Sequence, residues 1–133
     1  IPELIHMTGL SDIDFGIYSG GDVEANHNFC IFRNAAGGFS LTTTGSHDGG
    51  GRFNLAGAGT IAYRLEYSQG SGYFPVTPGV MLSNSTSSFI ANSARGCDGG
   101  TNTSLRLTID EADIISNPSG IYSDTLIIIV EPE

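Results

Sequence analysis

The stretch Ile61-Ala62-Tyr63-Arg64-Leu65-Glu66-Tyr67 decides the fold class. Apolar residues occupy every second position, and small or charged residues stand between them. Successive side chains of a β-strand point to opposite faces of a sheet, so this pattern predicts a strand with one buried and one exposed face. The same alternation recurs at 39–44 and 104–109. Further candidate strands are 13–18, 28–33, 52–55 and 122–130.

Turn residues separate these runs at short intervals. Eleven of the 19 glycines of the 133-residue chain lie at 37–38, 49–51, 57–59, 70–72 and 99–100. Many short strands with turn signals at this spacing predict an all-β sandwich or barrel in a single domain. One helical turn is expected at 110–115, where Asp110 could cap the first turn and Asn117-Pro118 would end it.

The charge balance excludes several classes of function. The chain has 14 acids and 5 bases, its net charge is −9, and every base is arginine. Binding to nucleic acid or to anionic lipid requires clustered positive charge, so neither partner is expected. Without lysine the chain has no P-loop lysine, Schiff-base lysine or lysine general base.

Whether the two cysteines form a disulfide depends on the compartment in which the protein folds. The sequence has no apolar run of 18 residues, so we expect no membrane insertion. It begins with Ile1, which fits a precursor whose signal peptide has been removed, although a trimmed chain would look the same. In an oxidising compartment Cys30 and Cys97 would pair, and the chain-entropy model assigns such a bridge roughly 4 kcal/mol. Two buried free thiols are the alternative.

No catalytic or metal-binding pattern stands out. The histidines His6, His27 and His47 lack the H-x-x-x-H and H-E-x-x-H spacings of zinc sites. Ser46, His47 and Asp48 are neighbours in a glycine-rich turn, whereas a catalytic triad is assembled from separate elements, so we interpret them as a solvated loop. We therefore expect no enzyme activity and no cofactor.

Calcium binding stays open from the sequence. Asp12, Asp14 and Asp98 lie in or beside predicted loops, where carboxylates can bind this ion. The complete D-x-D-x-D-G loop of an EF-hand is absent from the sequence. We predict no metal site, and calcium remains part of an alternative function.

The last predicted strand is apolar on both faces. If Leu126, Ile128 and Val130 enter the core, Ile127 and Ile129 point the opposite way. Either a loop of the same chain covers this second face, or another polypeptide does.

Three stretches resemble the spore coat protein U domain, a family that includes subunits of Csu-type (archaic) chaperone–usher pili. They are Asp14-Phe15-Gly16 after the N-terminal arm, the I-x-Y-x-L pattern at 61–65, and Gly120-Ile121-Tyr122-Ser123-Asp124-Thr125-Leu126 near the end. The resemblance runs from about residue 12 to residue 130, and the closing G-x-Y-S-D-T-L motif is its most specific part.

This resemblance implies an immunoglobulin-like Greek-key β-sandwich with an open edge that a donor strand completes. A periplasmic chaperone would lend the strand first, and the next subunit would replace it during assembly at the usher. Residues 12–133 would form the domain, and residues 1–11 an arm that could donate or swap a strand between copies. The resemblance places the partner groove along one wall with Phe15 and Ile17 and another with Leu126, Ile127, Ile128, Ile129 and Val130.

Two functions follow from these observations. The first is a secreted structural or adhesive subunit, located in the periplasm or on a bacterial cell surface and assembled by donor-strand complementation into a pilus that serves adhesion or biofilm formation. The alternative is a self-sufficient secreted β-sandwich that binds glycan or calcium through loops such as 46–52 and 68–74, without polymerising.

Overall fold

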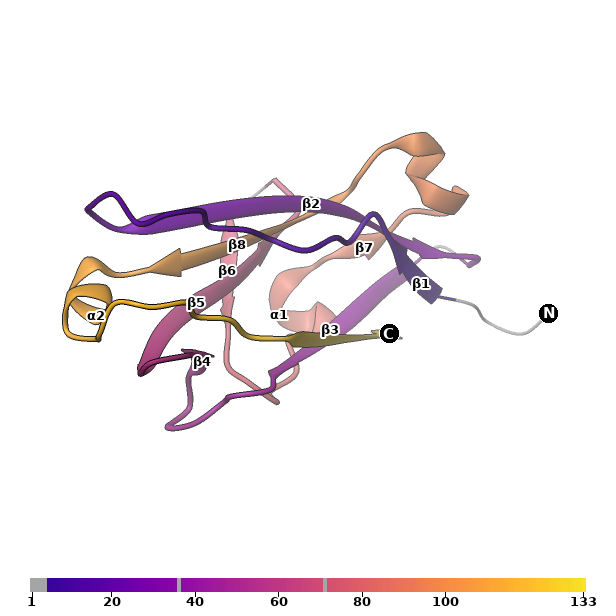
Figure 1. The fold of residues 1–133 in the computed structure, drawn as a ribbon. Helices are drawn as coiled ribbons and strands as arrows, with labels where there is room; N and C mark the ends of the chain where they lie inside the picture. The colour runs from indigo at the N-terminus through magenta and orange to yellow at the C-terminus, as the bar shows by residue number, and fades with distance from the viewer. Residues whose placement is uncertain (1–4, 36, 71) are drawn as a thin grey trace.

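Two antiparallel sheets pack face to face in the computed structural model, which describes residues 5–35, 37–70 and 72–133 (Figure 1). The larger sheet has the order β1-β2-β8-β5-β4, and β6 also pairs with β5. Its strands are β1 (Ile5–Thr8), β2 (Val23–Arg33), β8 (Thr103–Ile109), β5 (Thr60–Ser68), β4 (Phe53–Ala56) and β6 (Tyr73–Val76). The smaller sheet has the order β7-β3-β9, with β7 (Ile90–Ala91), β3 (Gly37–Gly45) and β9 (Leu126–Pro132). The prediction of an all-β sandwich is confirmed.

The strand order matches an immunoglobulin domain that lacks its seventh strand. Immunoglobulin domains place strands A, B, E and D in one sheet and C, F and G in the other. In chain order, β1, β2, β3, β5, β8 and β9 take the positions of A to F, because β1-β2-β8-β5 and β3-β9 are the neighbours that this topology requires. Strand G would lie beside β9, and no strand of the described chain occupies that position.

The predicted alternation on β5 is confirmed and supplies the centre of the core. Ile61, Tyr63, Leu65 and Tyr67 are all buried, while Arg64 is exposed. Phe53 of β4 stacks on Tyr63 with ring centroids 5.6 Å apart. The other members of the hydrophobic core cluster come from β2, β3, β4, β7, β8 and two connecting segments: Phe29, Ile31, Phe39, Leu41, Leu55, Leu82, Phe89, Ala91, Leu105, Leu107 and Ile109.

Short helical segments interrupt the connections. α1 (Asn84–Ser87) and η1 (Arg95–Gly99) lie between β6 and β8, and α2 (Glu111–Ile115) follows β8. The helical turn expected at 110–115 is therefore present. Asp110 stands at its N-cap position, but its carboxylate makes no capping hydrogen bond and instead pairs with Arg64 at 2.8 Å.

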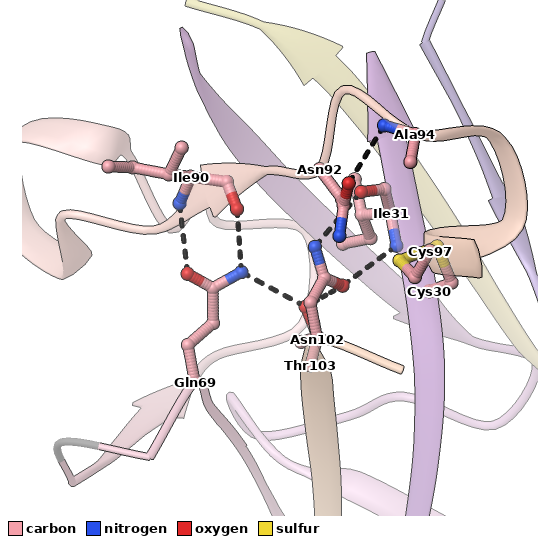
Figure 2. The surroundings of a disulfide bond; sticks show 9 residues. All are labelled: Cys30, Ile31, Gln69, Ile90, Asn92, Ala94, Cys97, Asn102 and Thr103. Carbon is pink, nitrogen blue, oxygen red and sulfur yellow. Dashed lines mark hydrogen bonds between the residues drawn. A yellow bond between two sulfur atoms is a disulfide. The ribbon is translucent and has the colours of Figure 1, made fainter. Parts of the chain in front are cut away.

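The disulfide is confirmed. Cys30 of β2 is bonded to Cys97 of η1, 67 residues further along the chain (Figure 2). Next to it the Asn102 side chain pairs with Ile31 as a neighbouring strand would: its amide group accepts from the Ile31 N–H at 2.9 Å and donates to the Ile31 carbonyl at 3.0 Å. Gln69, which follows β5 of the larger sheet, pairs in the same way with the backbone of Ile90 on β7, so its amide links the two sheets at this end.

Candidate functional site

A groove of about 420 Å³ opens on the side of the sandwich where the G strand would lie. Its two walls are the segment 10–16, which follows β1, and the segment 122–128, which leads into β9. In Figure 1 the indigo segment after β1 runs between β2 and the yellow C-terminal segment. The floor consists of core side chains: Leu55, Tyr63, Leu105 and Leu107. We call this cavity the edge groove.

The C-terminal wall has a free backbone edge. β9 pairs with β3 on one side, with Thr43 opposite Ile128 and Gly45 opposite Leu126. On its other side β9 pairs with no strand of the described ranges. Leu126 and Ile128 turn toward the core but are only half-buried, because their remaining surface lines the open groove. A strand laid along β9 would bury both side chains and use the unpaired backbone groups.

The other predicted residues of this wall lie outside the groove lining. Val130 packs against the core beyond the end of the groove. Ile127 and Ile129 are 61% and 51% exposed, and they lie on the outer face of β9. The all-apolar strand is thus divided into an inward row along the groove and an outward row in solvent.

The N-terminal wall is extended but forms no strand, contrary to the strand predicted at 13–18. Ile13 and Phe15 pack against the core and line the groove, while Asp12 and Asp14 alternate with them and are exposed. Ile17 does not meet the expectation that it belongs to this wall, since it is 97% exposed. The chain turns before it.

The turn before Ile17 is made at Gly16. The Asp14 carboxylate accepts a 2.8 Å hydrogen bond from the Gly16 N–H, and Gly16 has φ +75°, a conformation that glycine adopts at little cost. The alternation of inward and outward side chains therefore stops at Phe15.

The arm before the groove is partly built into the domain. β1 pairs with β2 of the same chain, with Met7 opposite Ile31. The His27 ring holds the end of this strand through a 2.8 Å contact between Nε2 and the Gly9 carbonyl. The possibility that residues 1–11 donate or swap a strand rests in part on Ile1 and Glu3, which lie outside the described residues.

One end of the edge groove is fixed by the buried carboxylate of Asp124, whose side chain is 2% exposed. Tyr63 donates its phenol to Oδ2 at 2.6 Å. His47 Nδ1 lies 2.9 Å from Oδ1, and the Ser46 hydroxyl and backbone N–H donate to the same oxygen at 3.0 and 3.1 Å. These contacts attach the chain entering β9 to β5 and to the loop that follows β3.

The hydrogen bonds set the charge state of this cluster. Burial alone raises the pKa of the Asp124 carboxyl, but the hydrogen bonds from Tyr63, His47 and Ser46 outweigh burial and hold the pKa below its usual value. Burial, and then the bond to Asp124, raise the pKa of the Tyr63 phenol far above its usual value. Asp124 is therefore ionised and Tyr63 protonated at neutral pH.

The arrangement of Ser46, His47 and Asp124 differs from that of a catalytic triad. In a triad the acid and the nucleophile contact opposite nitrogens of the imidazole. Here His47 Nδ1 lies against both the Asp124 carboxylate and the Ser46 hydroxyl, which is 3.4 Å away. The three residues thus position the backbone, and no sequence motif indicated the cluster because Asp124 is 77 residues from His47.

Two other features that bear on function are clusters of metal-ligating side chains and helices long enough to span a membrane. Among the side chains that the structure describes, no three from His, Cys, Asp or Glu gather closely enough to hold a metal ion. In residues 5–35, 37–70 and 72–133 no helix has the length and apolar character that crossing a membrane requires.

The comparisons with known proteins relate this chain to others through its fold. Neither the protein-family models nor the curated protein sequences give a match. Among solved structures, the chain is similar to a chain of a complex described as "Chaperone-tip adhesin complex is vital for synergistic activation of CFA/I fimbriae biogenesis", with a TM-score of 0.65 and 12% identity. The match covers 97% of this chain and 41% of that chain, so this protein spans less than half of its neighbour's length. At this identity the likeness establishes a shared fold.

Proposed function

We propose that this protein is a structural or adhesive subunit of a surface fibre, exported through the periplasm and completed by a strand that another polypeptide inserts into the edge groove. The observation that carries the proposal is the edge groove itself, which lies at the position of the missing G strand beside the unpaired edge of β9. The proposed role is non-catalytic and needs no cofactor.

The physical basis is β-augmentation. An added strand would form backbone hydrogen bonds along β9, and every second side chain of that strand would enter the groove. These side chains would cover the half-buried Leu126, Ile128 and Phe15 and contact the floor. Apolar burial of this kind contributes roughly 25 cal/mol per Å², so filling the groove stabilises both the domain and the complex.

The closing motif supports membership of the spore coat U and Csu-type family, because its residues build the C-terminal wall. Tyr122 donates its hydroxyl to the Pro118 carbonyl at 2.5 Å, an arrangement like the tyrosine corner of immunoglobulin domains. Asp124 anchors the wall, and Leu126 lines it. The solved neighbour with this fold comes from a chaperone–tip adhesin complex of fimbriae, which supports a chaperone and further pilus subunits as partners, and an usher is the third partner that we propose.

A peptide titration tests this proposal. The probe is a peptide of about nine residues in which Val alternates with Gln, a length typical of strands. At a hundredfold excess over the dissociation constant, binding adds about 2.7 kcal/mol of stability, and the melting temperature should rise by roughly 5–10 °C. A peptide of the same composition with its valines grouped together is the control and should have no effect.

Two matched variants locate the peptide. Ile128→Ser removes an inward side chain of the wall and should weaken binding, whereas Ile129→Ser alters the neighbouring outward side chain and should leave the inward contacts intact. A protein whose melting temperature does not respond to the alternating peptide would contradict strand donation.

The alternative of a glycan-binding module is favoured by one other hollow. This hollow of about 460 Å³ lies near the disulfide and has an uncharged lining made of Asn28, Ser68, Gln69, Gly70, Ile90, Thr101, Asn102, Thr103 and Ser104. Neutral amides and hydroxyls suit hydrogen bonding to a neutral oligosaccharide. Binding to neutral glycans on an array that is lost in Asn28→Ala would support this function, and absence of any glycan binding would remove it.

A further inference from the structure

The exposed residues along the rim of the edge groove indicate which side chains a donor strand would carry on its outward face. In any β-strand inserted between the two walls, alternate side chains point out of the groove. On one side these outward side chains would lie next to the exposed acids Asp12 and Asp14. On the other side they would lie next to Ile127 and Ile129, which are 61% and 51% exposed. The outward side chains of the donor would therefore lie between two aspartates on one wall and two isoleucines on the other.

The charges around the groove have one sign. Asp12 has no ion-pair partner among the described residues, and the Asp14 carboxylate only accepts the Gly16 N–H. No arginine of the described ranges lines the groove, and its one basic side chain, His27, contacts the Gly9 carbonyl. Asp124 also lines the groove, but its oxygens are satisfied by Tyr63, His47 and Ser46.

Lysine and arginine side chains match both neighbouring rows. Their aliphatic stems can lie along Ile127 and Ile129, while the charged head reaches an aspartate across the strand. Cross-strand pairs of opposite charge are favourable, and like charges placed opposite one another are unfavourable. An acidic donor would place its charges beside Asp12 and Asp14, and a neutral donor would leave these acids unpaired.

We propose that the natural donor segment alternates apolar residues, which enter the groove, with lysine or arginine, which point outward between Asp12 and Ile127. This inference rests on the proposed function and specifies the chemistry of the partner. It makes residues 1–8 (IPELIHMT) a poor donor, because they contain an acid and neither lysine nor arginine.

The test compares peptides with the same inward row. Val alternates with Lys, Gln or Glu in three peptides of about nine residues, and a fourth is the chain's own segment 1–8. Affinity is measured by fluorescence anisotropy at low salt, near 20 mM, and again at about 300 mM, where exposed charges are screened. We expect the Lys peptide to bind about tenfold tighter than the Glu peptide at low salt, the Gln peptide to lie between them, and the difference to shrink at high salt.

Variants of the protein assign the effect to the two acids. Asp12→Asn combined with Asp14→Asn should remove the preference for the Lys peptide while leaving the affinity for the Gln peptide within about twofold, because the amide oxygen introduced at position 14 can still accept the Gly16 N–H. The control combines Asp98→Asn with Glu111→Gln, which changes the net charge equally at positions outside the groove lining and should preserve the preference.

The outcomes separate this inference from the proposed function. Equal binding of the Lys, Gln and Glu peptides would overturn the basic donor and leave strand donation intact. Loss of the preference in the control variant as well would also overturn it, because the effect would then be one of net charge. Tightest binding by segment 1–8 would overturn it in favour of a second copy. Failure of all four peptides to bind would overturn both the inference and strand donation.

Discussion

The phenol of Tyr63 donates a 2.6 Å hydrogen bond to Oδ2 of Asp124, across 61 residues of sequence. Tyr63 lies on β5 in the larger sheet, and Asp124 precedes β9 in the smaller one. The bond therefore fixes the position of β9 relative to the core floor of the edge groove. Since the groove stays open along β9, this buried contact holds the C-terminal wall in place without a neighbouring G strand.

Asp124→Asn should lower the free energy of unfolding at pH 7 by about 1–3 kcal/mol, the usual cost of disrupting hydrogen bonds to a buried charged group. The folded-state pKa of Asp124 lies below its reference value of 3.8, so its carboxylate adds stability above about pH 4. That contribution is lost as the pH falls through the folded-state pKa. Urea unfolding between pH 7 and pH 2 should show a shallower acid limb for the variant, and an unchanged acid limb would contradict the assignment.

Tyr63→Phe should cost about 1–3 kcal/mol, because it deprives the buried Asp124 carboxylate of its shortest hydrogen bond. In the Asp124→Asn background the same substitution should cost less, since the charged acceptor is already gone. Tyr67→Phe is the control: the Tyr67 hydroxyl pairs with the Thr43 hydroxyl at 2.6 Å, and the hydrogen bonds to Asp124 come from Tyr63, His47 and Ser46 instead. A double-mutant cycle by urea unfolding that gives purely additive effects for Tyr63 and Asp124 would contradict the coupling.

Reduction of the Cys30–Cys97 bridge should lower the free energy of unfolding by about 2–5 kcal/mol. The bridge closes a loop of 67 residues, so most of the effect comes from the greater freedom of the reduced unfolded chain. Differential scanning calorimetry with and without reductant measures it. A melting temperature that reductant leaves unchanged, with free thiols verified by mass spectrometry, would be the contrary result.

Adjacent isoleucines of β9 should respond differently to a charge. Ile128→Asp puts a carboxylate against the core and should destabilise the fold by several kcal/mol or prevent folding. Ile129→Asp places the same group on the outer face, where the side chain is 51% exposed, and should change stability by less than about 1 kcal/mol. Circular dichroism during urea unfolding compares the two, and equal losses would contradict the division into inward and outward rows.

Strand content could be predicted from this sequence because its signal is local. The alternation of Ile61, Tyr63, Leu65 and Tyr67 is a period of two within seven residues, and the structure buries all four. By contrast, the predicted strand at 13–18 failed. Its alternation ends at Gly16, where an Asp14 side-chain hydrogen bond and a positive φ turn the chain, and this local geometry outweighs β-propensity.

The groove could be located only coarsely. Apolar residues on both faces of 126–130 indicated a partner surface. Periodicity does not say which of the two faces enters the core or whether an edge of the strand lacks a neighbour. The support of Asp124 by Ser46 and His47 left no sequence signal, because residues nearly 80 positions apart meet only after the sheets pack. The same holds for Asn102 and Gln69, whose amides replace strand backbone at the disulfide end.

Hydrogen–deuterium exchange with and without the alternating Val-Gln peptide tests strand donation most directly. The peptide should slow amide exchange in β9 at residues 126–130, where one edge lacks a partner, and also in the facing wall at 10–16. Exchange in α2, none of whose residues lines the groove, should be unaffected. Unchanged exchange in β9 at saturating peptide, or protection confined to segments outside the two walls, would contradict strand donation.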